Sequence, residues 1–183
     1  VQLSEESMQR ISQCREYLNQ KLENSSETIY GINTGFGSLY NKNISPDQLE
    51  KLQENLVKSH ACGTGPEVPE EIVQLMLFLK VQSLAYGYSG VQLVTVERLI
   101  AMFNEEVLPR VYEMGSLGAS GDLAPLAHLA LPLIGLGEIN YTENAKLKKC
   151  KARKYFKQAN SIMASHPDFN HPGNLYFSIM VYN

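Results

Sequence analysis

The chain has 183 residues, of which 44% are hydrophobic and 19% charged, with a formal net charge of −3 at pH 7. This length suits one domain with a real core, and the composition is typical of a soluble globular protein rather than a disordered one. The slightly negative charge gives no general reason to expect nucleic-acid binding.

Residues 4–23 predict a surface helix, because Ser4 can cap it and two glutamates follow in its first turn. Its apolar residues are sparse, so we expect it to lie against a larger body. A short extended piece then runs into a glycine-rich loop at residues 31–37. Three glycines and one asparagine in seven residues indicate a mobile or tightly turned segment.

Tyr30, at the start of this loop, has two interpretations. It is either a half-buried packing residue or a catalytic base on a loop that closes over substrate. A phenol has an unperturbed pKa of about 10. It therefore becomes a useful base only where its surroundings lower that pKa or connect it to a proton network.

The next helix is predicted to start at Ser45-Pro46, with a capping serine and a proline at the first helical position. Three leucines of this helix share a stripe with His60, which points inward near the end, where Gly63 should stop the helix. His60 is therefore either a satisfied core histidine or a site residue. Cys62 has no activating neighbour in the sequence and is interpreted as packing.

Two further helices are predicted before the central loop. Residues 70–85 are apolar on nearly all sides, which predicts burial in a large helical assembly or between subunits. A break at residues 86–90 precedes a helix over residues 94–106, which Leu108-Pro109 ends.

The stretch 115–122 holds three glycines and two serines directly before an apolar run, residues 123–136. The run predicts a buried helix that Pro132 bends or ends early. Asp122 or Ser120 can cap this helix, whose positive end favours negative charge. His128 is interpreted as structural, and no metal is implied because no second His or carboxylate lies at ligand spacing.

Ala119-Ser120-Gly121 also has two interpretations. It is a small-residue turn that caps the helix, or a segment that cyclises. If the loop bends tightly, the Gly121 nitrogen reaches the Ala119 carbonyl carbon, and dehydration turns the Ser120 side chain into an electrophilic methylidene. A phosphate-binding loop is disfavoured, because the glycine spacing is not the dinucleotide fingerprint and no Gly-Lys-Ser/Thr follows.

Three blocks, in order along the chain, resemble the aromatic amino-acid ammonia-lyases, and histidine ammonia-lyase most closely: residues 30–37 (YGINTGFG), 59–65 (SHACGTG) and 118–128 (GASGDLAPLAH). The resemblance runs from about Gln2 to Glu138. It implies a mainly α fold, with helices packed around a glycine-rich loop site, as the N-terminal part of the ammonia-lyase fold. It also implies the prosthetic group 4-methylideneimidazol-5-one (MIO), formed autocatalytically from Ala119, Ser120 and Gly121.

The resemblance further implies residue roles. Ser120 and Tyr30 are the expected catalytic residues, with Tyr30 acting on the β-carbon proton of the substrate. His60 is expected to face the substrate, and Gly31 to belong to the substrate pocket. The implied reaction converts L-histidine to trans-urocanate and ammonia. The alternatives are a tyrosine ammonia-lyase or aminomutase, and an inactive fragment that associates with a full-length relative.

Beyond Glu138 the character of the sequence changes. Seven basic residues lie between Lys146 and Lys157 and predict a solvated helix face or a loose tail. No later asparagine matches the family's Asn-Gly block, whose Asn holds the MIO carbonyl. We therefore expect an N-terminal ammonia-lyase domain at residues 1–139 and a divergent basic tail at residues 140–183.

The expected setting is the cytosol. No signal-like or bilayer-spanning segment is recognised, and three cysteines without a CxxC pair suggest neither a zinc site nor a disulfide framework. The first residue is Val, which suggests a fragment or a trimmed chain. The expected partners are a small amino-acid substrate and further copies of the chain, since the family forms tetramers. Neither nucleic acid nor membrane is expected as a partner.

Overall fold

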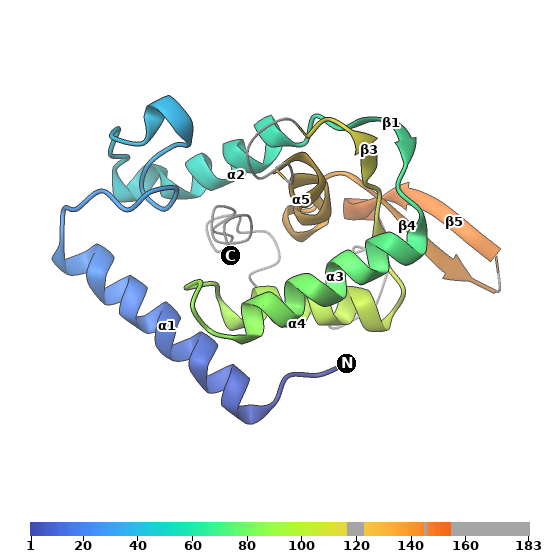
Figure 1. The fold of residues 1–183 in the computed structure, drawn as a ribbon, viewed down its shortest axis with the longest axis horizontal. Helices are drawn as coiled ribbons and strands as arrows, with labels where there is room; N and C mark the ends of the chain where they lie inside the picture. The colour runs from blue at the N-terminus through green and yellow to red at the C-terminus, as the bar shows by residue number, and fades with distance from the viewer. Residues whose placement is uncertain (117–122, 145, 155–183) are drawn as a thin grey trace.

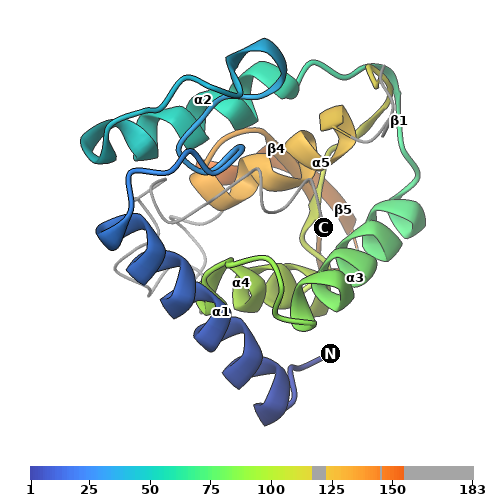
Figure 2. The same ribbon diagram turned by 60° about the vertical axis from the view of Figure 1, so that its left-hand side comes forward.

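The computed structural model describes residues 1–116, 123–144 and 146–154. Helices dominate it, which confirms the predicted mainly α fold class: α1 (Glu5–Asn24), α2 (Leu49–His60), α3 (Glu70–Ala85), α4 (Leu93–Asn104) and α5 (Leu123–Ala130). The helix α5 lies between α2 and the α3–α4 pair (Figure 1 and Figure 2). This central position brings the residues that follow the Ala119–Gly121 segment close to the end of α2.

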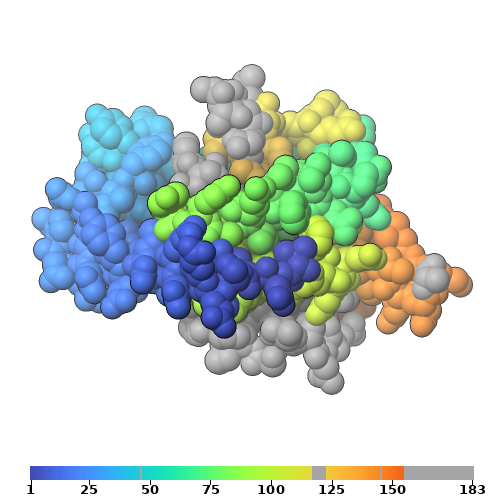
Figure 3. Space-filling view, turned by 60° about the horizontal axis from the view of Figure 1, so that its bottom comes forward, coloured from blue at the N-terminus to red at the C-terminus, as the bar shows by residue number. Residues whose placement is uncertain are grey.

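Helix α1 is the predicted surface helix. The Ser4 hydroxyl oxygen accepts a hydrogen bond from the Ser7 N–H at 3.2 Å, and Glu5 and Glu6 occupy the first turn. Ile11 is its buried residue. Figure 3 shows α1 lying across α3 and α4, so the larger body that the sequence predicted is this helix pair.

The core is built around α3 and α4. Their fully buried side chains include Leu77, Leu84, Leu99 and Met102, and the rings of Phe78 and Phe103 lie 5.9 Å apart. The opposite face of α3 is different, because Ile72, Leu75 and Leu79 remain about half exposed. Within this chain α1 and α4 cover only one face of the helix, so the burial predicted in a large helical assembly or between subunits stays a prediction for the other face.

Both boundaries of α2 differ from the expectations, and α4 ends at Asn104 rather than at residue 106. A 3-10 turn, η2 (Pro46–Gln48), forms where the capping sequence predicted the start, and α2 begins only at Leu49. The end of α2 comes at His60, with Ala61 rather than Gly63 as the capping position. Pro132 behaves as predicted, because α5 stops at Ala130 and continues as a 3-10 turn, η3 (Leu131–Ile134).

Short antiparallel strands complete the fold. Strand β1 (Thr64–Glu67) pairs with β3 (Tyr112–Met114), and β4 (Glu138–Glu143) lies between β2 (Leu108–Pro109) and β5 (Lys146–Lys151). Leu108 is paired with Asn140, and Ile139, fully buried, is paired with Cys150.

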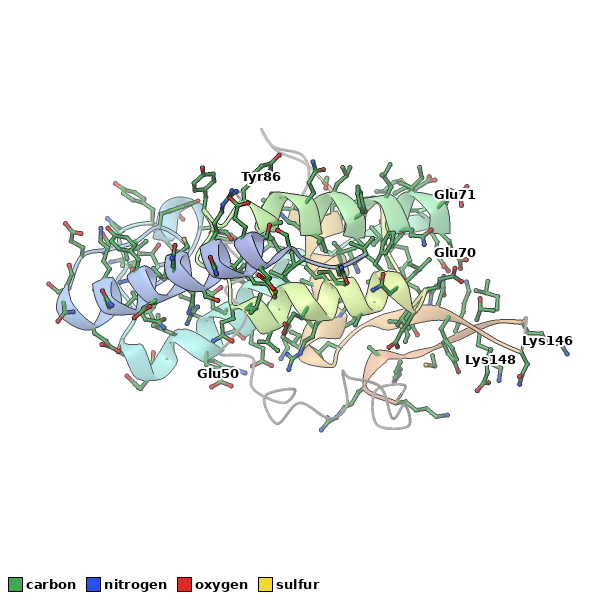
Figure 4. The ribbon with its side chains drawn as sticks, turned by 90° about the horizontal axis from the view of Figure 1, so that it is seen from below. Glu50, Glu70, Glu71, Tyr86, Lys146 and Lys148 are labelled. Carbon is green, nitrogen blue, oxygen red and sulfur yellow. The ribbon has the colours of Figure 1, made fainter. Side chains whose placement is uncertain are left out.

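The hairpin of β4 and β5 corrects the interpretation of the basic run. Residues 146–151 form a strand rather than a helix face or a loose tail. The strand lies at the edge of the sheet, and Figure 4 shows Lys146 and Lys148 pointing away from the body of the molecule. Charges on an edge strand are compatible with pairing because they stay in water. The predicted boundary at residue 140 falls inside β4, and residues 140–143 and 146–151 belong to one sheet with β2. That residues 155–183 form a divergent tail stays a prediction.

Across the described ranges, no helix combines the length and the apolar character needed to cross a membrane.

Candidate functional site

The loop that begins at Tyr30 is tightly turned and held from within. Asn33 and Thr34 are buried. The Asn33 side chain accepts from the Ile29 N–H at 2.7 Å and donates to the Glu27 carbonyl at 2.9 Å. Gly31 has a φ of 70°, in the left-handed region that favours glycine, and its N–H donates to the Thr34 hydroxyl at 3.0 Å.

Gln53 connects this loop to α2. Its side chain is only 1% exposed, and its amide nitrogen donates to the carbonyls of Gly31 and Ile32 at 2.9 and 3.1 Å. Sequence analysis missed this residue. A signal was present, because Gln53 follows Leu49 by four positions and precedes Leu56 by three, which places its side chain on the inward face. A buried glutamine needs such partners, so it marks the point where the loop is anchored.

Gly31 is buried, and both of its backbone polar atoms are hydrogen-bonded within this anchor. It is not among the described residues that line the pocket beside Tyr30, a cavity of about 640 Å³ that is described below. Its role in the substrate pocket stays a prediction.

Tyr30 presents its phenol to solvent and to a pocket. The side chain is 46% exposed, and its hydroxyl oxygen accepts a hydrogen bond from the Gly37 N–H at 3.2 Å. A backbone donor at that oxygen helps to carry negative charge there. The Phe36 ring lies 5.8 Å from the Tyr30 ring and 5.3 Å from the His60 ring. The Phe36 ring therefore contacts both predicted site residues.

His60 is the last residue of α2, and its tautomer follows from its contacts. Its Nδ1 lies 2.8 Å from the Leu56 carbonyl oxygen, which can only accept, so Nδ1 carries a proton. In the neutral ring Nε2 is then the basic nitrogen. An imidazole held in this way can accept a hydrogen bond from an N–H or O–H group of a ligand.

Two adjoining pockets meet at His60. The larger, about 640 Å³, is the Tyr30 pocket, whose lining includes Tyr30, Phe36, His60 and Leu123. The smaller, about 260 Å³, is the Ser116 pocket, lined by residues that are small apart from His60 and Leu123: Ser59, His60, Cys62, Gly115, Ser116, Leu123 and Ala124. Ser59, His60 and Leu123 belong to both linings.

The predicted prosthetic-group residues, Ala119, Ser120 and Gly121, lie outside the described residues. Their flanks do not. Ser116 precedes the undescribed stretch 117–122 and Leu123 follows it, and both line the Ser116 pocket beside His60. The small residues of this lining leave room for a compact ring, so the surroundings fit MIO. The structure thus brings Tyr30 and His60 together with both ends of the segment.

A histidine and two glycines pack tightly behind the Ser116 pocket. The Gly63 N–H donates to His128 Nε2 at 2.9 Å. His128 is buried, and burial lowers its pKa, which favours the neutral ring that can accept this hydrogen bond. A Cβ on Gly63 would meet His128 Nε2 at 2.8 Å, and a Cβ on Gly115 would meet the Gly63 Cα at 2.8 Å. This contact agrees with the structural role predicted for His128.

The cysteines are free, and Cys62 is exposed rather than packed. Its interpretation as a packing residue is wrong, because α2 has already ended and the chain turns outward at the rim of the Ser116 pocket. Within the part of the chain that the structure describes, no group of three His, Cys, Asp or Glu side chains could hold a metal ion.

A larger hollow of about 770 Å³ lies at the end of α1, lined by residues that include Glu23, Asn33, Asn43 and Leu49. None of the residues predicted for catalysis belongs to its described lining. We therefore take the two pockets that meet at His60 as the candidate site.

Known proteins are similar to this chain in sequence and in fold. Histidine ammonia-lyase of Legionella pneumophila (strain Corby) is 55% identical over 121 residues, which are 66% of this chain and 24% of that relative. The crystal structure of histidine ammonia-lyase from Trypanosoma cruzi matches with a TM-score of 0.72 and 36% identity, over 86% of this chain and 29% of the other. Tyrosine aminomutase from Streptomyces globisporus matches with a TM-score of 0.76 and 30% identity, over 86% and 28%.

The chain thus spans about a quarter of the length of the curated relatives it matches. The profile of the aromatic amino acid lyase family matches residues 1–164, well beyond Glu138, where the motif resemblance was expected to stop. Because this match covers most of the chain, including Tyr30, His60 and both flanks of the Ala119–Gly121 segment, the chain belongs to the aromatic amino acid lyase family.

Proposed function

We propose that this site carries out ammonia-lyase chemistry on L-histidine, giving trans-urocanate and ammonia. The observation that carries the proposal is the meeting of Tyr30, His60 and both flanks of the Ala119–Gly121 segment at two adjoining pockets. The 55% identity to a histidine ammonia-lyase supports the substrate. Since the chain spans only part of that relative, activity and substrate are both proposals.

The proposal includes formation of MIO from the chain itself. The Gly121 nitrogen attacks the Ala119 carbonyl carbon, forming a carbon–nitrogen bond, and the carbonyl oxygen leaves as water with the two amide hydrogens of Ser120 and Gly121. Ser120 then loses its hydroxyl and its Cα hydrogen as a second water, which leaves a carbon–carbon double bond. Formation of the ring and its methylidene therefore releases two water molecules and needs no other reactant.

When formed, MIO supplies an electrophile that makes the substrate's amino group a better leaving group. The chain's own residues supply the rest. Tyr30 removes the proton from the substrate's β-carbon. Its side chain lines the larger pocket, where the substrate would bind. His60, which lines both pockets, is expected to position the substrate's ring or amino group.

The start of α5 adds electrostatic support. Leu123 and Ala124, its first residues, line the Ser116 pocket. The backbone N–H groups of a helix N-terminus carry partial positive charge, so negative charge that develops in this pocket is stabilised.

The intact mass of the purified chain tests ring formation. We expect a mass lower than that of the sequence by two waters, and no such loss after Ser120→Ala. An unmodified mass in the unsubstituted chain contradicts the proposal. Absorbance of urocanate with L-histidine as substrate then measures turnover.

A tyrosine-directed ammonia-lyase or aminomutase is the second candidate within this chemistry. The likeness to the tyrosine aminomutase structure favours it. Parallel assays with L-histidine, L-tyrosine and L-phenylalanine separate the two, and preferred turnover of L-tyrosine would replace histidine as the substrate.

A catalytically inactive fragment that associates with a full-length relative is the candidate from another class. It is favoured by the coverage, since the chain spans 24% of its Legionella relative. This candidate predicts no urocanate from the chain alone and a stable complex with a full-length relative after mixing.

We also propose a homo-oligomer and a cytoplasmic location. The half-exposed apolar face of α3 supports the first, because such a patch marks an association surface. The exposed thiol of Cys62 supports the second, because a reducing compartment preserves such a thiol.

A further inference from the structure

Gly63 contacts the chain on both sides of the Ala119–Gly121 segment. Its N–H donates to His128 of α5, the helix that follows the segment. Its Cα packs against Gly115, which is followed by Ser116 and then by the segment. We call Gly63, Gly115 and His128 the glycine anchor.

The anchor leaves little room for other residues. Gly115 has a φ of 132°, and a Cβ there would meet backbone atoms of Gly63 and Cys62 within 3.3 Å. On its other side, Gly63 is closed in by His128 and by the Cβ of Tyr112. The Tyr112 ring also packs edge-on against the His128 ring, 5.1 Å away. The imidazole is therefore fixed in orientation by one ring contact and one hydrogen bond.

We propose that His128 is a positioning residue for the cyclisation of Ala119–Gly121. By accepting the Gly63 N–H from its place in the last turn of α5, it ties that helix to Gly63, which packs against Gly115 ahead of the segment. Ring closure requires the Gly121 nitrogen and the Ala119 carbonyl carbon to be held within reach, and fixing the two ends lowers the entropic cost of that approach. The inference rests on the proposed function, since it concerns the formation of MIO.

Two substitutions distinguish the contribution of the hydrogen-bond acceptor of His128 from that of its aromatic ring. His128→Phe keeps an aromatic ring against Tyr112 but cannot accept a hydrogen bond. His128→Gln loses the ring but places an oxygen acceptor at a similar reach. The full chain is purified at intervals after induction, and the fraction that has lost two waters is measured by intact mass. Thermal melting and hydrogen exchange of the Gly63 amide are measured on the same samples.

We expect His128→Phe to cyclise roughly tenfold more slowly or worse, because the part-buried Gly63 N–H is left without its acceptor and α5 loses its tie to Gly63. His128→Gln should cyclise at close to the unsubstituted rate, and its Gly63 amide should stay protected from exchange. Equal rates for the Phe variant and the unsubstituted chain would overturn the inference. So would equal slowing in both variants, because the acceptor would then not be the relevant feature.

Gly63→Ala keeps the test decisive if His128→Phe does not fold. Its Cβ would displace the far end of a side chain, the His128 ring, rather than backbone. The same slowing is expected, and cyclisation at the unsubstituted rate would overturn the inference. Loss of two waters by the unsubstituted chain, unaffected by these variants, rejects only the role of His128. No loss in the unsubstituted chain rejects the proposed function as well.

Discussion

The phenol of Tyr30 carries the first prediction at the scale of single residues. Tyr30→Phe removes the hydroxyl that lines the Tyr30 pocket but keeps the ring beside Phe36. Urocanate formation should fall by about 10²–10⁴-fold, the usual contribution of general acid–base catalysis. The loss of two waters should be unchanged, because the ring forms without this base.

Tyr40→Phe is the matched control, since Tyr40 is exposed on the same loop and is not in the described lining of that pocket. It should leave turnover unaffected. Full activity of Tyr30→Phe would remove Tyr30 from the mechanism.

Gln53 carries a prediction about stability. Gln53→Ala leaves the carbonyls of Gly31 and Ile32 without this buried donor. We expect the free energy of unfolding to fall by about 1–3 kcal/mol, measured by urea denaturation. Gln13→Ala, at an exposed site of α1, should stay within about 0.5 kcal/mol of the unsubstituted chain. Equal effects would show that the buried amide does not anchor the loop.

Single residues also show where sequence reasoning stops. Tyr30 and His60 were found because they lie inside recognisable blocks. The partners of Gln53 are backbone carbonyls 21 and 22 positions away, and the partner of His128 is 65 positions away. No spacing rule within one helix reveals such distant pairs.

At the scale of elements, an ion-pair cluster ties three of the strands together. Arg110, directly after β2, pairs with Glu67 of β1 and Glu138 of β4, and Lys149 of β5 lies 3.0 Å from Glu67. The hydrogen bond from Arg110, followed by that from Lys149, lowers the pKa of Glu67 from 4.5 to about 2. Each strand is short, so this cluster helps to hold the two sheets in place.

The cluster predicts a pH dependence with a definite sign. The pKa of Glu67 is lower in the folded chain than in the unfolded one, so its stabilisation is complete above about pH 4.5 and is lost as the pH falls through about 2. Glu67→Gln should lower the urea midpoint at neutral pH, and the difference from the unsubstituted chain should shrink over that acidic range.

Glu143→Gln provides the comparison, because Glu143 pairs with Lys148 at an exposed site of the hairpin. Exposed pairs contribute little, so its urea midpoint should hardly change at any pH. A Glu67→Gln difference that is constant with pH would exclude the cluster as its source.

The elements were predicted unevenly. Capping residues and helical periodicity located α1, α3, α4 and α5, because these signals are local. Strand β2 has only two residues, too few for any periodic pattern. The hairpin was missed because its second strand is mostly lysine, and its pairing depends on β2, which lies about thirty positions before β4 in the sequence.

At the scale of the whole molecule, the outer face of α3 predicts association between copies of the chain. Leu75→Lys with Leu79→Lys places charge on this half-exposed apolar face without touching the core. We expect the double variant to sediment as a smaller species than the unsubstituted chain. Tyr17→Lys, at an exposed position of α1, should leave sedimentation unchanged. An identical mass for all three chains would exclude this face as the interface.

The whole fold could be anticipated only in class. The prediction of a mainly α protein with the N-terminal part of the ammonia-lyase fold is confirmed by the helices and by the matching structures. The central position of α5 between α2 and the α3–α4 pair could not be read from the sequence (Figure 2). It depends on which helices pack together. The pattern of apolar residues marks the buried face of each helix but does not identify the helix that it contacts.

The exposed thiol of Cys62 makes the rim of the Ser116 pocket accessible to labelling. The other two cysteines are partly buried, so a thiol-reactive fluorophore should attach first beside His60. Emission from such a dye would respond when an amino acid enters, whether or not product forms. The labelled chain would thus report binding of the amino acid by fluorescence and its turnover by product formation, as two separate signals.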